Sequence, residues 1–247
     1  MNILKGIFYR IWALWALLFF VITMIVFLIP FFLFCYYQNE PKKTIRFIKY
    51  SRVWMSFYLL MIGCPLTVKG KENFRKGENY IVLCNHNTLM DVPVSSPAIP
   101  RGNKTIAKIE MAKVPLFKYI YKTGSVLVDR SSDSSRKESY NKMKKVLSMG
   151  LHMCIYPEGT RNKTDQPLKA FHNGAFRLAI ETRKSIIPGI IFNTRKVLPF
   201  DKPYQVIPHS LEIHFLAPIP LLTEDTITSL QARVFEIMKN YYQENQR

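Results

Sequence analysis

The chain has 247 residues, enough for one domain of ordinary size and an additional segment. Lys and Arg total 35 against 17 Asp and Glu, and the formal charge of +18 predicts an anionic partner: nucleic acid, a membrane surface or a phosphate-bearing substrate. The four cysteines lie singly in apolar surroundings without a C-x-x-C pair, so the sequence indicates neither a zinc site nor a disulfide framework.

The first predicted element is a long apolar helix. Residues 11–39 carry no charge, and as a helix they exceed the roughly 30 Å hydrocarbon core of a bilayer. A signal peptide is the competing interpretation, but the apolar run is too long for one and no A-x-A-like cleavage site follows it. We expect a retained membrane anchor. Pro30 leaves two geometries open, a spanning helix and a re-entrant hairpin.

A basic amphipathic segment follows the anchor. Lys42, Arg46 and Lys49 share one helix face, where each cation can contribute roughly 1 kcal/mol to binding an anionic leaflet; a solvated charged face is the alternative. The apolar run 53–66 is short for a span, which favours an interfacial or re-entrant helix. Basic residues are denser after the anchor than before it, so the positive-inside rule favours the cytoplasmic membrane with the rest of the chain on its cytoplasmic side.

Strand-like and helix-like runs alternate beyond the anchoring segment, residues 1–66. Buried-strand patterns cover 80–84, 104–107, 125–128, 153–156 and 185–192. The last of these is expected to be interrupted at Pro188. Helical patterns begin near Asp133, Gly174 and Thr223. This order predicts an α/β fold for residues 67–247, a single domain with a largely parallel or mixed sheet flanked by helices.

Polar residues follow three of the predicted strands directly. They are Asn85-His86-Asn87, Asp129-Arg130, and the run from Pro157 to Arg161. In open α/β sheets, ligands bind outside the carboxyl ends of the strands. Three such clusters together indicate one shared site.

His86 and Asp91 form the first candidate pair. A neutral imidazole can take a proton from an attacking hydroxyl, while a carboxylate on the other ring nitrogen fixes the tautomer. Residues five apart on a continuous helix differ by about 140°, so the pair meets only if the helix begins just after His86, where Asn87 and Thr88 are good N-cap types. The alternative is a capping box from Thr88 to Asp91 beside an ordinary loop histidine.

Several enzyme and binding classes lack their motifs in this sequence. There is no G-x-S-x-G elbow of a serine hydrolase and no H-E-x-x-H metal site. No RRM, KH or zinc pattern supports nucleic-acid binding. A histidine–carboxylate base without a covalent nucleophile fits direct attack by an acceptor hydroxyl on an activated acyl group.

The other clusters supply candidate anion ligands. Arg161 offers a planar fork suited to phosphate, Gly159 lets the backbone approach a ligand, and Thr160 adds a hydroxyl. A Pro-Glu-Gly turn with a solvated arginine is the alternative. Arg130 either joins the site or pairs with a surface carboxylate, and Lys108 adds a cation after another strand.

Together these blocks resemble the glycerolipid acyltransferase family, specifically the 1-acyl-glycerol-3-phosphate acyltransferases. The resemblance rests on Asn85-His86 with Asp91, Ala107-Lys108-x-Glu110, 124–130 (GSVLVDR), 156–161 (YPEGTR), 171–175 and Ile187-Pro188. The sequence departs from the family at His172 and Asn173, where relatives often carry lysine, so that block receives no role.

The resemblance implies a role for each site residue. His86 is the general base and Asp91 its orienting partner. The acceptor's glycerol-phosphate is bound by Arg130, Glu158, Gly159, Thr160 and Arg161, with Lys108 near the phosphate.

The reaction implied is transfer of a fatty acyl group from acyl-CoA or an acyl-carrier-protein thioester to the sn-2 hydroxyl of lysophosphatidic acid, making phosphatidic acid. No metal or other cofactor is implied. The expected partners are membrane lipid, lysophosphatidic acid and the thioester donor, and not nucleic acid. The alternatives are an acyltransferase for another lysolipid or glycerol 3-phosphate, and a non-catalytic lipid-binding membrane protein.

Overall fold

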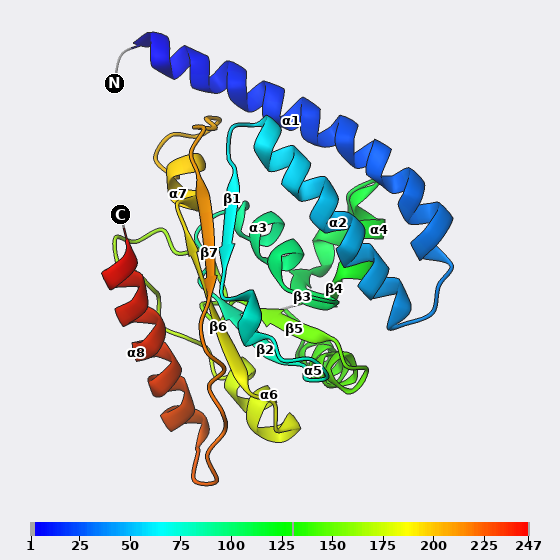
Figure 1. Ribbon diagram of the computed structural model, residues 1–247, viewed down its shortest axis with the longest axis vertical. Helices are drawn as coiled ribbons and strands as arrows, with labels where there is room; N and C mark the ends of the chain where they lie inside the picture. Colours follow the sequence, from blue (N-terminus) through cyan, green and yellow to red (C-terminus); the bar gives the residue numbers. More distant parts are fainter. Residues whose placement is uncertain (1–2, 130, 247) are drawn as a thin grey trace.

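The computed structural model describes residues 3–129 and 131–246. A helical hairpin lies along one side of an α/β domain (Figure 1). Its first arm is α1 (Ile3–Phe31), continued by the π-helical turn η1 (Phe32–Tyr36), and its second arm is α2 (Lys42–Met61). The stretch Ile3–Tyr36 is the one helix in the described part of the chain that is long and apolar enough to cross a bilayer. Only 22% of the apolar 18-residue stretch within it is buried against the rest of the protein.

The second arm joins two segments that the sequence predicted separately. The expected short helix over 53–66 is wrong, because no glycine or proline breaks the run from Lys42 to Met61. Aromatic packing holds α2 against α1: the rings of Trp54 and Phe27 stack with centroids 4.6 Å apart. The Trp54 indole N–H also donates to Thr23 Oγ1 at 2.9 Å.

A seven-stranded sheet carries the domain, in the order β1-β7-β6-β2-β5-β3-β4. Five neighbouring strands, from β6 to the edge strand β4, are parallel: β2 (Ile81–Cys84), β3 (Asn103–Lys108), β4 (Ser125–Val128), β5 (His152–Ile155) and β6 (Ile186–Phe192). The two strands on the other side of β6 run in the opposite direction: β7 (Leu211–Phe215) is antiparallel to β6, and the edge strand β1 (Leu66–Lys69) is parallel to β7. The α/β prediction with a largely parallel or mixed sheet is confirmed. The expected interruption of the 185–192 strand is wrong, since β6 passes through Pro188 unbroken.

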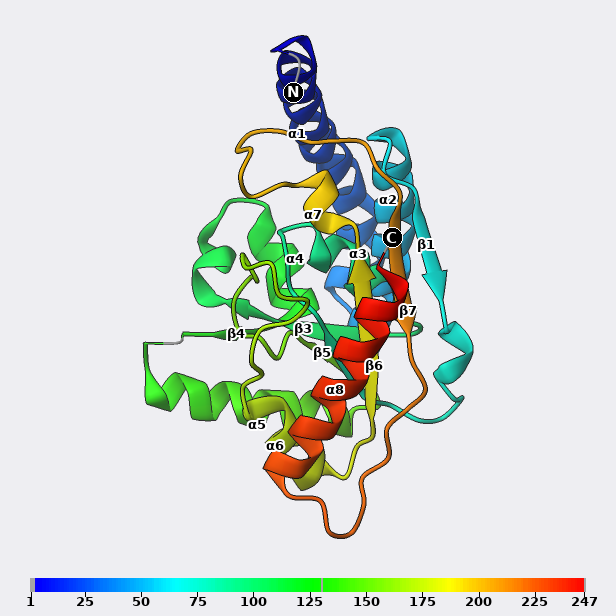
Figure 2. The ribbon, with the colours of Figure 1, turned by 90° about the vertical axis from the view of Figure 1, so that its left-hand side faces the viewer.

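Helices cover both faces of the sheet. The hairpin face carries α2 with α3 (Asp91–Ala98) and α4 (Phe117–Gly124), while the opposite face carries α5 (Asp133–Ser148), α6 (Gly174–Thr182) and α8 (Ile227–Asn245) (Figure 2). Each face has its own apolar core. Three short helical turns complete the chain: η2 (Lys71–Asn73), η3 (Ile109–Lys113) and α7 (Thr194–Val197).

The last helix begins three residues later than predicted. Thr226, not Thr223, is its N-cap, because the Thr226 side chain accepts the Ser229 N–H and the Ser229 hydroxyl accepts the Thr226 N–H. Glu224 and Asp225 therefore precede the helix. The sequence patterns also missed β1 and β7, which are short strands at the reversed edge.

The turn of the hairpin is bound to the sheet by an ion pair. Glu40 accepts from Lys104 Nζ of β3 at 2.8 Å and from the Thr44 hydroxyl at 2.7 Å. Burial disfavours the charged form of Glu40, but the hydrogen bonds from Lys104 and Thr44 outweigh it and lower the pKa of this carboxyl below its ordinary 4.5. Lys104 itself is buried, with 8% exposure.

Replacing Glu40 with Gln leaves the buried Lys104 ammonium without a counter-charge. We expect a loss of about 2 kcal/mol of stability, less than for a fully buried pair because Glu40 is partly exposed. The midpoint of thermal unfolding in detergent measures it, with the exposed Glu72→Gln as control. A carboxyl with a lowered folded pKa stabilises above its ordinary pKa, so the difference from wild type should be present at pH 7 and shrink as the pH falls below 4.5. Equal midpoints for the two variants at pH 7 would contradict this role.

Candidate active site

The predicted site residues that the structure describes lie at the carboxyl ends of the parallel strands. Because β2, β5, β3 and β4 are parallel neighbours, the loops that follow them leave the sheet on the same side. His86 follows β2, the run 157–161 follows β5, and Lys108 ends β3. Arg130, which follows β4 in the sequence, lies outside the described residues.

His86 and Asp91 are in contact. The chain is irregular after β2, and Asp91 is the first residue of α3, so its carboxylate turns back toward the loop. His86 Nδ1 lies 2.8 Å from Asp91 Oδ2, and the same oxygen accepts the N–H groups of Asn87 at 2.5 Å and Thr88 at 2.7 Å. One fully buried carboxylate thus binds both the imidazole and two backbone N–H groups of the loop. The predicted N-cap at Asn87 or Thr88 is wrong, because α3 begins after Met90 without a side-chain cap.

This geometry fixes the imidazole tautomer. A carboxylate only accepts hydrogen bonds, so Nδ1 of His86 carries the proton and donates it to Asp91. Nε2 is then the basic nitrogen. The His86 side chain keeps 19% exposure, so the ring is not fully enclosed.

The loop after β5 holds the backbone of His86 from both sides. Glu158 Oε1 accepts the His86 N–H at 2.7 Å, and the His86 carbonyl accepts the Asn162 N–H at 2.6 Å. The imidazole also stacks on Tyr156, with centroids 4.4 Å apart. The Tyr156 hydroxyl bonds Ser95 of α3 at 2.7 Å, and burial raises the pKa of this phenol well above 10.

Glu158 ties two loops together. It has 1% exposure, and its two carboxylate oxygens accept backbone N–H groups, Oε1 from His86 and Oε2 from Lys169 at 3.0 Å. Burial raises the pKa of Glu158 above its ordinary 4.5, against the opposing effect of these two donors. In this conformation Glu158 positions the chain around His86 and is not itself on the surface.

Thr160 and Arg161 lie on the open side of the same loop, and both are exposed. Lys169, which no sequence motif indicated, lies beside them, and its Nζ donates to Thr160 Oγ1 at 2.7 Å. Asn162 was not indicated either, because its contact with His86 joins residues 76 apart and no local spacing signals it. Lys108 is exposed at the end of β3. The site thus combines the partly exposed His86, held by the buried Asp91, with several exposed cations.

A metal centre finds no support here. Within residues 3–129 and 131–246, no group of three or more His, Cys, Asp or Glu side chains is placed to hold an ion.

Comparison with known proteins gives a consistent result. Residues 65–192 match the Acyltransferase family. The 1-acyl-sn-glycerol-3-phosphate acyltransferase of Cocos nucifera is 33% identical over 172 residues, 69% of this chain and 54% of that protein. Its Saccharomyces cerevisiae namesake is 28% identical over 194 residues, 76% of this chain and 63% of that protein. The chain thus spans between half and two thirds of the length of these two relatives.

A solved structure shares the whole fold. The 1-acyl-sn-glycerophosphate (LPA) acyltransferase PlsC from Thermotoga maritima superposes with a TM-score of 0.75, covering 99% of this chain and 97% of that one. The sequence identity is 22%, so this likeness establishes the fold.

Gly159 is required at its position for two separable reasons. Its φ of +68° is unfavourable for other residues by roughly 1 to 2 kcal/mol, and an added Cβ would lie 2.6 Å from the His172 ring. We expect Gly159→Ala to lower the thermal unfolding midpoint, and the double variant with His172→Ala to regain only the steric part. Gly174→Ala is the matched control, because a Cβ there meets nothing within 4 Å. A Gly159→Ala midpoint equal to that of the control would refute this account.

Proposed function

The chain belongs to the Acyltransferase family, and on that premise we propose that it transfers a fatty acyl group from an acyl thioester to the free sn-2 hydroxyl of lysophosphatidic acid, forming phosphatidic acid. The observation that carries the proposal is the 2.8 Å contact between His86 Nδ1 and Asp91 Oδ2, which leaves Nε2 as the base of a partly exposed ring. The names of the relatives from coconut and yeast support this acceptor.

In the proposed mechanism the acceptor hydroxyl gives its proton to His86 Nε2 as its oxygen attacks the thioester carbonyl. Asp91 stabilises the imidazolium that forms. Collapse of the tetrahedral intermediate breaks the carbon–sulfur bond, and the imidazolium returns its proton to the leaving thiolate. General-base assistance of this kind contributes about 10² to 10⁴ in rate.

Cys84 is the nearest alternative nucleophile, and its surroundings argue against that role. It is fully buried in β2. The hydrogen bond with Cys154 and burial together raise the pKa of its thiol well above 9. A thiol that stays protonated and inaccessible does not form an acyl-enzyme, so direct attack by the acceptor is the simpler route.

The cations at the site edge are proposed to bind the acceptor's phosphate. Arg161 and Thr160 are exposed beside the loop that holds His86, and Lys169 donates to Thr160 at 2.7 Å. Lys108, the exposed last residue of β3, adds a further cation at the carboxyl ends of the strands. Arg130 is proposed for the same role from the sequence alone, because it lies outside the described residues. Arginine pairs with phosphate through two parallel hydrogen bonds, which orients the glycerol as well as attracting it.

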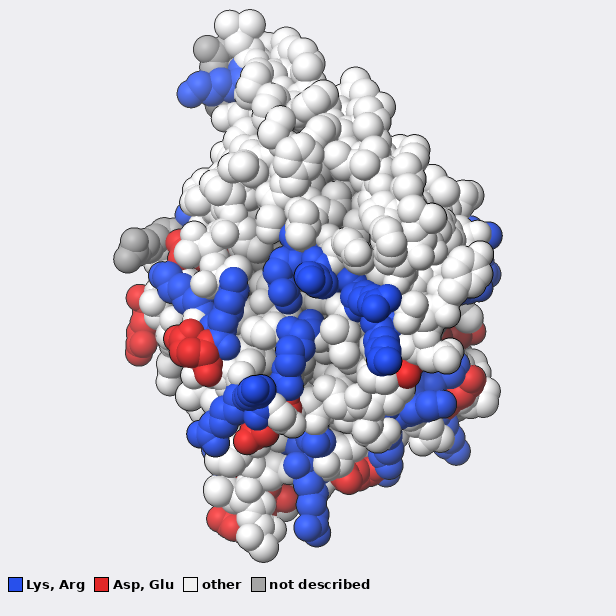
Figure 3. All heavy atoms as spheres, turned by 45° about the vertical axis from the view of Figure 1, so that its right-hand side comes forward, with Lys and Arg blue, Asp and Glu red and all other residues white. Residues whose placement is uncertain are grey.

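The hairpin is proposed to hold the enzyme at the membrane where its lipid acceptor resides. α1 exposes large apolar side chains along its length, among them Ile11, Leu18 and Val26 at 52 to 64% exposure. Figure 3 shows this face almost without charge, with a band of Lys and Arg beside it. We place the catalytic domain on the cytoplasmic side of the cytoplasmic membrane, and acyl-CoA or acyl-carrier protein as the soluble donor.

The direct test is synthesis of phosphatidic acid by the purified full chain from lysophosphatidic acid and acyl-CoA or acyl-carrier protein. His86→Ala should lower turnover by at least about 10²-fold while the protein stays membrane-bound. His209→Ala, outside the site, is the control. Near wild-type turnover in His86→Ala would rule the mechanism out. If the wild type is inactive with lysophosphatidic acid but active with another lysolipid or with glycerol 3-phosphate, the acceptor is reassigned to that compound.

Arg161→Ala should raise the KM for lysophosphatidic acid more than the KM for the thioester, because the arginine is assigned to the acceptor's phosphate. Truncating one charge-assisted contact costs roughly 1.5 to 3 kcal/mol, or about 10- to 100-fold in acceptor kcat/KM. Arg177→Ala on α6 is a matched exposed control. An unchanged acceptor KM in Arg161→Ala would remove this residue from the phosphate site.

A further inference from the structure

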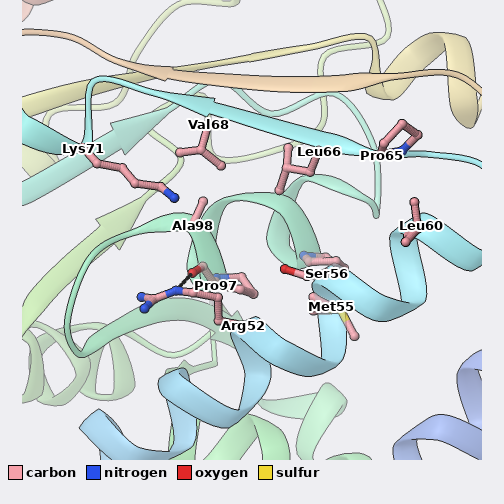
Figure 4. Close-up of a pocket in the computed structure, with 11 residues that line it drawn as sticks. Arg52, Met55, Ser56, Leu60, Pro65, Leu66, Val68, Lys71, Pro97 and Ala98 are labelled. Atoms are coloured by element: carbon pink, nitrogen blue, oxygen red, sulfur yellow. Dashed lines mark hydrogen bonds between the residues drawn. The ribbon is translucent and has the colours of Figure 1, made fainter.

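A groove outside the catalytic site lies between α2, α3 and β1 (Figure 4). Its volume is about 310 Å³, near the lower end of pockets that bind small ligands. Its walls are mainly apolar and include Met55 and Leu60 of α2, Leu66 of β1 and Ala98 of α3. None of the residues assigned above to catalysis or phosphate binding lines it.

The groove has a charged end and an apolar end, as an amphiphilic ligand does. Lys71 and Arg52 lie toward one end and Leu60 and Pro65 toward the other (Figure 4). No acidic residue is among its lining residues. Its charged end is therefore complementary to an anion, and its remaining length to a hydrocarbon chain.

Arg52 has donors both for the protein and for a ligand. Its Nε donates to the Pro97 carbonyl at 2.7 Å and its Nη2 to the Ile99 carbonyl at 2.9 Å, at the carboxyl end of α3. A guanidinium has five N–H groups, so these two bonds leave others available. Lys71 is exposed and extends toward the groove.

The groove is next to the apolar surface of the hairpin. Val53, Phe57 and Leu60 are 68, 52 and 63% exposed along α2, and Leu60 is also part of the groove wall. Because α2 packs against α1 in the hairpin, these side chains add to the exposed apolar side chains of α1. A lipid in a bilayer that covers this face reaches the groove sideways, without leaving the membrane.

We propose that this groove binds one anionic glycerophospholipid of the bilayer. Its phosphate lies between Lys71 and Arg52, and one acyl chain lies along Met55, Leu60 and Leu66. The bound lipid fastens α2 to the carboxyl end of α3, the helix whose first residue is Asp91. This lipid is neither acceptor nor product, and its binding does not depend on the reaction proposed above.

The test uses the full chain in phosphatidylcholine nanodiscs containing phosphatidylglycerol, which is neither a lysolipid nor the proposed product. Native mass spectrometry counts the lipids that stay bound when the protein is released from the nanodisc. Wild type should retain one phosphatidylglycerol, and Lys71→Glu should weaken retention by at least about tenfold. Lys76→Glu, an exposed lysine outside the groove, should retain it like wild type. Leu66→Trp, which fills the groove, should abolish retention.

Three results would overturn the proposal. Equal losses in Lys71→Glu and Lys76→Glu would mean only a general surface attraction. Loss of the lipid in Arg161→Ala, with Lys71→Glu unaffected, would place it in the catalytic site. A changed donor chain-length preference in Leu66→Trp would assign the groove to the reaction's own acyl chain. Lys71→Met, which keeps the side-chain length, serves as the second variant if Lys71→Glu does not fold.

Discussion

The organisation of this protein depends on the way the loop after β5 holds the peptide groups of His86. Glu158 accepts its N–H and Asn162 donates to its carbonyl, at 2.7 and 2.6 Å. Asp91 then fixes the ring from the start of α3. Backbone and side chain are thereby constrained by three residues from two segments, the loop after β5 and the start of α3. A general base needs this kind of support, because proton transfer depends on placement within a fraction of an ångström.

The helical hairpin and the candidate active site are parts of one packed structure. Glu40 binds the turn of the hairpin to β3 through Lys104, and Arg52 on α2 holds the carboxyl end of α3 through Pro97 and Ile99. α3 thus connects a helix of the hairpin to Asp91, the partner of His86. A hairpin lying in a bilayer would set the orientation of the site toward lipid without any flexible linker.

Local patterns were sufficient for the central elements. Short apolar runs followed by polar residues located the five parallel strands. Their alternation with helices implied the α/β class, because parallel strands need helical crossovers. The reversed edge was not predicted. β1 and β7 have four and five residues, and their direction is decided by pairing with distant strands, not by their own sequence.

The sequence by itself determined that the chain has a long apolar N-terminal helix and an α/β domain, and it singled out His86 and Asp91, which the structure brings into contact. These properties follow from residue type and near-neighbour spacing. Only the tertiary structure decided that Glu158 is buried and accepts the backbone N–H groups of His86 and Lys169. It also decided that Lys169 and Asn162 belong to the site and that a groove lies between α2, α3 and β1. Such contacts join residues far apart in the chain, and they exist only once the sheet order has brought their loops to the same edge.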